Sequence, residues 1–300
     1  MFTHMKKTIH LNKKLMIIAG PCSVDQNNLN EILRIAEMKI GGKRAIAGTR
    51  VVGLKSRTNL SVDGKNMGID FAIFMKNLEK LIEGKPPSTF EEPPSVTIAK
   101  KICKETGLII ATEIMSPLVQ LPSFEDEVFK NKVLAWSPAV SQLGWPAMKM
   151  ALFAKRNGWS VGIKNGKWKG MEKTWEGLAS YVRAHVESDK AIMIHRGIEV
   201  PEKGKFRSLP VHESARQMKE KGFQVFFDPS HSFGPLMRDD IVQGTIDAMK
   251  LKTSDGQNVY DGVLIEVGTS ITDTQQHITL DELQKLCKTL STFRELVSPV

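Results

Sequence analysis

The sequence lacks the features that mark several large classes of protein. Its 300 residues contain no apolar run near the roughly 20 residues needed to cross a bilayer, and the first residues, MFTHMKKTIHLNKK, lack the apolar stretch of a signal peptide. Its three cysteines, Cys22, Cys103 and Cys287, are too few and too scattered for a disulfide framework. These absences predict a cytoplasmic protein without a membrane segment.

The chain also has no dense basic run and no recognisable nucleic-acid motif, although its formal net charge is +9. Its lysines are spread along the sequence. Acidic small molecules gathered by a basic cleft explain such a charge more simply than nucleic acid does. We therefore expect anionic small-molecule substrates, and neither nucleic acid nor a membrane as a partner.

What the sequence does contain is an alternation of short runs rich in Ile, Val and Leu with longer helical patterns, which is typical of a parallel sheet built from βα units. The length and the 41% hydrophobic content allow one large α/β barrel or two smaller domains. The predicted strands are 14–19, 49–54, 108–112, 132–136, 160–164, 190–195, 223–227 and 262–266. Helical patterns lie near 27–39, 93–106, 117–129, 145–157, 173–187, 211–221, 237–250 and 279–296.

Eight βα units in a chain of this length predict a single (β/α)8 TIM barrel. A doubly wound open sheet is the alternative, but its first strand is normally followed by a glycine-rich phosphate turn, which is missing here. The long connection between the second strand and the second barrel helix, residues 55–92, contains a helical pattern of its own (GIDFAIFMKNLEKLIEG). We assign residues 1–300 to one catalytic domain, with 1–13 as a short N-terminal extension and no added regulatory domain.

Polar residues follow nearly every predicted strand, at the end where the active site of a barrel lies. Cys22 follows the first strand, His231 the seventh, and Glu266 ends the eighth, shortly before Asp273. Because strands seven, eight and one are neighbours in a closed barrel, these side chains can converge. A thiolate, an imidazole and two carboxylates suit a divalent ion such as Mn²⁺, Fe²⁺, Co²⁺ or Zn²⁺. A lone cysteine or histidine is more often structural, so this prediction depends on their shared position.

Five cationic side chains belong to the other half of the predicted barrel mouth. Arg50, Lys55 and Arg57 lie on the second strand and its exit, Lys164 ends the fifth strand, and Arg196 follows the sixth. Cations at the ends of buried strands need anionic partners. Two phosphates and a carboxylate would supply them, since arginine suits bidentate contact with such groups and lysine acts as a point charge.

The motifs at these strand ends resemble those of one enzyme family. The segments IIAGPCSVD, TRVVGLKSRT, ATE, IKNG, IHRG, DPSH, IEVG and SITD follow the order and spacing of the type I 3-deoxy-7-phosphoheptulonate (DAHP) synthases, whose superfamily includes the 3-deoxy-octulosonate-8-phosphate and sialic acid synthases. The likeness spans about residues 15 to 297. It implies a metal-dependent TIM barrel that condenses phosphoenolpyruvate with erythrose 4-phosphate in the shikimate pathway, and a homo-oligomer, either a dimer or a tetramer.

The resemblance also implies a role for each matching residue. The metal ligands would be Cys22, His231, Glu266 and Asp273. Phosphoenolpyruvate would lie among Arg50, Lys164 and Arg196, with Glu113 close by. The aldose would be held by Lys55, Arg57 and Thr58, because the family's Lys-Pro-Arg-Thr signature reads Lys-Ser-Arg-Thr here. Lys55 and Glu113 are the candidates for moving protons.

One position departs from the family pattern. After the fourth strand the family has Gly-Ala-Arg, whose arginine helps to bind a phosphate, whereas this chain has Ala135, Trp136 and Ser137. Losing one charge-assisted contact costs on the order of 1.5–3 kcal/mol if nothing replaces it. We keep Ser137 as a substrate-binding residue, with Lys149 or a lysine of 164–169 as a compensating cation. Two alternatives stay open: another aldose acceptor within the same chemistry, and a catalytically silent barrel that binds a ligand.

Overall fold

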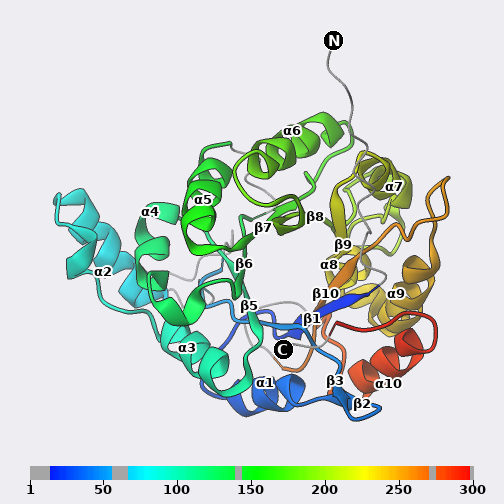
Figure 1. The fold of residues 1–300 in the computed structure, drawn as a ribbon, viewed down its shortest axis with the longest axis horizontal. Helices are drawn as coiled ribbons and strands as arrows, with labels where there is room; N and C mark the ends of the chain where they lie inside the picture. The colour runs from blue at the N-terminus through cyan, green and yellow to red at the C-terminus, as the bar shows by residue number, and fades with distance from the viewer. Residues whose placement is uncertain (1–13, 56–66, 139–143, 270–274, 298–300) are drawn as a thin grey trace.

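The computed structural model describes residues 14–55, 67–138, 144–269 and 275–297, and its centre is a closed barrel of eight parallel strands (Figure 1). Their order around the barrel is β1-β10-β9-β8-β7-β6-β5-β4. The strands are β1 (Met16–Gly20), β4 (Gly48–Arg50), β5 (Ile109–Glu113), β6 (Val133–Trp136), β7 (Ser160–Lys164), β8 (Ala191–His195), β9 (Gln224–Phe227) and β10 (Gly262–Glu266). All eight predicted strands and the (β/α)8 fold class are confirmed, and the doubly wound alternative is wrong.

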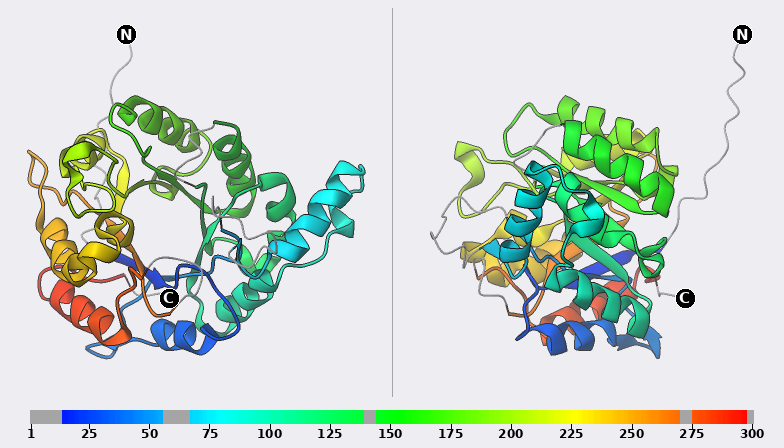
Figure 2. Two further views of the ribbon diagram at one scale, coloured as in Figure 1. Left: turned by 180° about the vertical axis from the view of Figure 1, so that it is seen from behind. Right: turned by 90° about the vertical axis from the view of Figure 1, so that its left-hand side faces the viewer.

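Helices surround the barrel as an outer ring, as Figures 1 and 2 show. They are α1 (Leu29–Ala36), α2 (Phe71–Ile82), α3 (Pro94–Thr106), α4 (Pro117–Gln120), α5 (Gly144–Asn157), α6 (Glu172–Arg183), α7 (His212–Glu220), α8 (Pro229–Phe233), α9 (Ile241–Lys250) and α10 (Leu280–Ser291). The last helix begins with a capping box, in which the side chains of Thr279 and Glu282 each accept from the other's backbone N–H. Within the described ranges, none of these helices has the length and apolar character that crossing a membrane requires.

One local prediction was wrong, and one local element was not predicted. The segment 117–129 is not one helix, because α4 ends at Gln120 and two short 3-10 turns follow. Pro122 has no N–H to donate and its ring opposes a continuing helix, which explains the break. A small hairpin, β2 (Lys39–Ile40) and β3 (Lys43–Arg44), follows α1, and its turn residues Gly41 and Gly42 have φ values of 57° and 79°. Such a turn favours glycine at both positions.

The barrel interior is filled by large apolar side chains. Leu134, Trp136, Ile194, Phe226 and Leu264 belong to one buried cluster inside the strands, and Trp136 and Phe226 are fully buried. A second, larger cluster fills the space between the strands and the outer helices. Strands covered on both faces explain the continuous apolar runs in the sequence. The polar residues at the strand ends therefore lie next to a closely packed apolar interior.

A chain of three hydrogen-bonded aromatic side chains supports β8, two of them buried and His212 partly buried. His195 Nδ1 lies 2.8 Å from the hydroxyl of Tyr260, and that hydroxyl lies 2.7 Å from Nδ1 of His212. The rings pack around Phe227. Burial lowers the pKa of His195 to about 3 and the pKa of His212 to about 4. Both imidazoles are therefore neutral near pH 7.

We predict that these histidines make the fold sensitive to acid. An unfolded histidine takes up its proton near pH 6.5, whereas His195 and His212 stay neutral in the fold until the pH approaches 3 to 4. Below pH 6.5 the unfolded state therefore binds more protons than the folded state. The free energy of unfolding falls as the pH falls, and at pH 5 it is lower by about 2 kcal/mol per histidine than at pH values well above 6.5. Urea unfolding at pH 7 and pH 5 measures this loss. The variant His195→Gln should show a smaller loss, and an equal loss would contradict the assignment.

Candidate active site

The predicted site residues within the described ranges gather at the carboxyl ends of the strands, and all are buried except His231, whose side chain is 11% exposed. Arg57, Thr58 and Asp273 lie outside the described residues. Three ion pairs connect the cationic half of the mouth to the acidic half. Their partners are Arg50 with Glu266 at 3.0 Å, Lys164 with Asp228 at 3.5 Å, and Lys55 with Glu113 at 3.8 Å.

Glu266 is the most fully bonded of these carboxylates. Its Oε1 accepts from Arg50 Nη2 at 3.0 Å and its Oε2 from Gln276 Nε2 at 2.7 Å. Its backbone N–H donates to the hydroxyl of Ser230 at 2.9 Å. Burial alone would raise the pKa of Glu266, but His231 and Arg50 outweigh it and lower the pKa to about 2. The carboxylate therefore keeps its negative charge inside the barrel mouth.

His231 lies between two carboxylates. Its Nδ1 is 2.9 Å from Asp228 Oδ1, and its Nε2 is 3.8 Å from Glu266 Oε1. Asp228 also accepts from the backbone N–H of His231 and so caps the short helix α8. Burial lowers the pKa of His231 to about 4 despite both acidic neighbours. A metal-binding histidine is usually neutral, and a carboxylate usually holds the ring nitrogen that does not bind the metal.

The predicted metal site is assembled in part. His231 and Glu266 face one another, but the residues that the structure describes contain no group of three or more His, Cys, Asp or Glu side chains close enough to hold a metal. Cys22 is buried nearby, with its backbone N–H donating to His277 Nε2 at 3.2 Å. The neutral imidazole and the charged carboxylate fit two positions of a divalent site.

Lys55 and Glu113, the residues predicted to move protons, lie close together in the mouth. Lys55 Nζ donates to the carbonyl oxygen of Cys22 at 3.1 Å and lies 3.8 Å from Glu113 Oε2. Burial alone would lower the pKa of Lys55, but the nearby Cys22 and Glu113 raise it above its ordinary value. Burial would raise the pKa of Glu113, but Lys55 and Lys164 outweigh it and lower the pKa. Both side chains therefore keep their charges near neutral pH.

Trp136 explains how two cations share the centre of the mouth. The guanidinium carbon of Arg50 lies 5.5 Å from the centre of its ring, and Lys164 Nζ lies 5.2 Å from it. Cations placed over an indole ring are stabilised by its quadrupole. Ser137, the next residue, is buried at the same strand end. Trp136 therefore places a neutral aromatic ring beside two cations, and the sequence did not reveal this contact.

Asn165 holds the turn that carries Arg196. Its Oδ1 accepts from the backbone N–H of Arg196 at 2.7 Å, and its Nδ2 donates to the carbonyl oxygen of Gly197 at 2.9 Å. Asn165 and Arg196 both belong to motifs visible in the sequence, but those motifs predicted a role for Arg196 alone. The guanidinium of Arg196 donates to Ser208 at 3.3 Å, and burial lowers its pKa.

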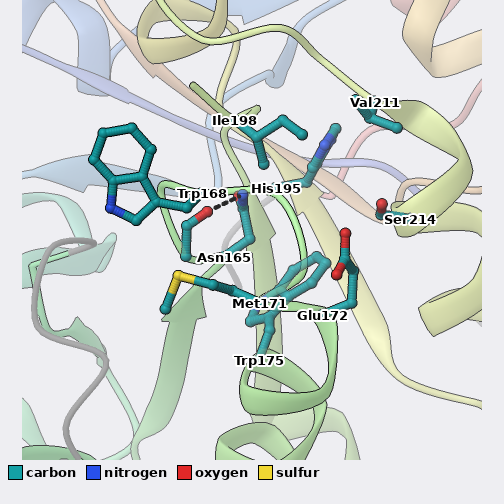
Figure 3. Close-up of a pocket in the computed structure, with 10 residues that line it drawn as sticks. Asn165, Trp168, Met171, Glu172, Trp175, His195, Ile198, Val211 and Ser214 are labelled. Atoms are coloured by element: carbon teal, nitrogen blue, oxygen red, sulfur yellow. Dashed lines mark hydrogen bonds between the residues drawn. The ribbon is translucent and has the colours of Figure 1, made fainter. Parts of the chain in front are cut away.

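A small pocket lies behind this turn, between the strand ends and helices α6 and α7 (Figure 3). Asn165 and His195 line it together with Trp168, Met171 and Trp175. None of the cations described above lines it. The candidate active site therefore lies inside the barrel mouth. The pocket lies behind the turn that positions Arg196.

Asp228 is a central residue of the mouth to which the sequence motifs assigned no role. The DPSH segment drew attention to His231, but its aspartate contacts both His231 and Lys164. Burial alone would raise the pKa of Asp228, but His231 and Lys164 outweigh it and hold the pKa well below its usual range. One carboxylate thus connects the cationic half of the mouth with the imidazole.

Comparison with known proteins identifies the class of fold. No protein-family model and no curated protein sequence matches the chain. It is similar to the crystal structure of a phospho-2-dehydro-3-deoxyheptonate aldolase (DAHP synthase) from Thermotoga maritima, with a TM-score of 0.67, 16% identity, and coverage of 95% of this chain and 72% of that chain. A truncated 3-deoxy-D-arabino-heptulosonate 7-phosphate synthase from the same organism gives a TM-score of 0.63, 16% identity, and coverage of 95% and 91%.

At this identity the likeness shows the fold. The chain is a (β/α)8 barrel with a buried, charged mouth, and its barrel is DAHP synthase-like. The resemblance drawn from the sequence motifs is confirmed at this level.

We predict that replacing Asp228 destabilises the fold. The variant Asp228→Asn leaves the buried ammonium of Lys164 without its nearest carboxylate, and breaking a buried ion pair costs about 3–5 kcal/mol. Asp126 provides the control, because its pair with Lys100 at 3.2 Å lies at the surface, with the two side chains 41% and 23% exposed. Measured by urea unfolding, the loss in the free energy of unfolding should be several-fold larger for Asp228→Asn than for Asp126→Asn. Equal losses would mean that Asp228 does not balance a buried charge.

Proposed function

We propose that the chain is a 3-deoxy-7-phosphoheptulonate synthase, a transferase that condenses phosphoenolpyruvate with erythrose 4-phosphate and releases phosphate. This would be the first step of the shikimate pathway, which leads to chorismate and the aromatic amino acids. The observation that carries the proposal is a pair of buried guanidinium groups with free donors. Among the residues that the structure describes, Arg50 Nη1 and Arg196 Nε are buried and have no hydrogen-bond acceptor.

Unsatisfied buried cationic donors favour an anionic ligand. Arg196 forms no ion pair within 4.0 Å in the part of the chain that the structure describes, although it is buried. Burial lowers the pKa of Lys164 as well as that of Arg196, so both cations are poorly solvated. A phosphate and a carboxylate on one small molecule would satisfy them with charge-assisted hydrogen bonds. Phosphoenolpyruvate carries both groups.

The acceptor would bind on the side of Lys55, with Arg57 and Thr58 holding its phosphate. Two anionic substrates repel each other in water, so fixed cations that hold both contribute by proximity and orientation. The pair of Lys55 and Glu113 lies at the border between the two substrate positions. Lys55 would donate a proton to the aldehyde oxygen as the carbon–carbon bond forms, and Glu113 would take one from the water that attacks C2.

Cys22, His231, Glu266 and Asp273 would hold a divalent ion, which when bound supplies Lewis acidity to polarise the aldehyde or to activate the attacking water. His231 is prepared for this role by Asp228, which fixes its tautomer. Glu266 Oε1 accepts from Arg50 and lies 3.8 Å from His231 Nε2, so this carboxylate lies beside both the guanidinium and the imidazole proposed as a ligand.

The proposal is tested by phosphate release from phosphoenolpyruvate with a panel of aldoses, with and without Mn²⁺. We expect release with erythrose 4-phosphate when Mn²⁺ is present, and little release with arabinose 5-phosphate or an unphosphorylated sugar. The variant Arg196→Met should abolish release, while Arg183→Met on the outside of the barrel should not. Release with a different aldose alone would favour the alternative acceptor. No release with any aldose would favour a barrel that only binds ligands.

A second prediction concerns the metal. Cys22 supplies the softest of the four proposed ligands, so Cys22→Ala should lower the bound metal and reduce turnover at least about 100-fold. Treatment with EDTA should have the same effect and be reversed by Mn²⁺. Cys103→Ala is the matched control, because Cys103 is equally buried but lies in α3, in the core between strands and helices. Metal analysis and phosphate release check both effects, and full activity after EDTA would refute the metal assignment.

A further inference from the structure

One buried tryptophan of the described residues differs from the other two in its hydrogen bonding. Trp159 Nε1 donates to the carbonyl oxygen of Phe129 at 3.0 Å, and Trp175 Nε1 donates to that of Ile163 at 2.7 Å. Trp136 Nε1 is buried as well, but the described part of the chain gives it no acceptor. A buried indole N–H usually finds a partner, because leaving it without one costs free energy. The N–H of Trp136 is therefore available to a ligand.

Trp136 lies where the apolar interior of the barrel meets its charged mouth. It is the last residue of β6, and its side chain belongs to the apolar cluster inside the strands. The other buried members of that cluster are hydrocarbon side chains, which offer no lone pair to an N–H. Arg50 and Lys164 lie beside the same ring. A ligand that accepts from Nε1 would therefore enter from the mouth and meet these two cations.

Trp136 also belongs to a layer of inward-facing side chains at the strand ends. Leu134 and Ile194, two residues before Trp136 and Arg196, belong to the cluster inside the strands. Because side chains alternate along a strand, Trp136 and Arg196 face inward too. Arg50 ends β4, so β4, β6 and the exit of β8 each contribute one side chain, as alternate strands do in a barrel layer. With Arg50 Nη1 and Arg196 Nε, this layer contains three buried donors that have no acceptor in the described part of the chain.

Two lysines expected to compensate for the family's missing arginine lie elsewhere. Lys149 Nζ is 4.6 Å from the centre of the Trp145 ring on α5, and Lys167 Nζ is 5.0 Å from the centre of the Trp168 ring. Both of these rings are exposed, unlike the mouth residues. Near the end of β6 the mouth therefore contains a buried neutral donor, and these two lysines do not add a cation to it.

We propose that the indole N–H of Trp136 donates a hydrogen bond to the phosphate of phosphoenolpyruvate and takes the place of the family's arginine at this strand end. The inference rests on the proposed function, since it adds a residue that binds the same substrate. The three terminal oxygens of a phosphate can meet three donors that come from three strands. The two guanidinium groups would form charge-assisted hydrogen bonds, and the indole would form a neutral one.

Nuclear magnetic resonance of the indole N–H groups tests this contact on the full chain, with diamagnetic Zn²⁺ as the metal and no aldose. The chain has five tryptophans, and the variant Trp136→Phe identifies the signal of Trp136. Phosphoenolpyruvate should move this signal downfield, because Nε1 gains an acceptor. The signals of Trp159 and Trp175 should stay in place, because each already has a carbonyl acceptor. Inorganic phosphate should also move the Trp136 signal, whereas pyruvate, which lacks the phosphate, should not.

Calorimetry of phosphoenolpyruvate binding measures what the hydrogen bond contributes. Trp136→Phe keeps an aromatic ring beside the two cations but removes the N–H. It should raise the dissociation constant roughly 2- to 12-fold, the change expected for one neutral hydrogen bond. Trp159→Phe is the matched control, because Trp159 is equally buried but packs outside the strands and donates to Phe129. Ser137→Ala removes the neighbouring hydroxyl and should have a smaller effect than Trp136→Phe.

The outcomes separate this inference from the proposed function. A Trp136 signal that stays in place while phosphoenolpyruvate binds would overturn the inference alone, as would an unchanged dissociation constant in Trp136→Phe. A signal that moves with pyruvate but not with phosphate would also overturn it. A wild type that binds no phosphoenolpyruvate would overturn both. If Trp136→Phe does not fold, replacing the other four tryptophans one at a time identifies the signal by elimination, and the titration of the wild type still decides.

Discussion

The buried ion pair between Arg50 and Glu266 is the constraint on which the barrel mouth depends. Arg50 ends β4 and Glu266 ends β10, and β1 lies between these two strands. The guanidinium spans the gap by donating to the carbonyl oxygen of Pro21, just after β1, and to Glu266. Arg50 therefore joins β4 to β10 across β1, at the carboxyl ends of the three strands. Charges taken out of water need this degree of bonding, because their desolvation offsets much of their attraction.

From that pair the charges extend across the mouth in alternation. Glu266 faces His231, His231 contacts Asp228, and Asp228 faces Lys164, whose ammonium shares the ring of Trp136 with Arg50. The network returns to the residue at which it began. A closed network of this kind fixes each side chain from two sides, which is the preorganisation that an anion-binding site needs. Trp136 also separates the two cations, since Arg50 and Lys164 both lie near its ring.

Much of the fold was predictable because buried parallel strands leave a strong pattern. Each apolar run of four to six residues had to be a strand, and the polar residue after it had to lie at the mouth. The break at Pro122 was visible in the sequence but was outweighed by the helical pattern around it. The role of Asp228 was not predictable, since an aspartate at a helix start has a structural explanation as an N-cap.

The exit of β4 and the start of α2 are joined by backbone contacts. The backbone N–H of Lys55 donates to the carbonyl oxygen of Met67 at 2.8 Å, and that of Asp70 donates to the carbonyl oxygen of Gly53 at 3.0 Å. A Cβ at Gly53 would lie 2.0 Å from Asp70 Oδ2, and one at Gly68 would lie 2.3 Å from the carbonyl oxygen of Gly53. A larger residue at either glycine would therefore act on the mouth from a distance, by shifting the strand exit that carries Lys55.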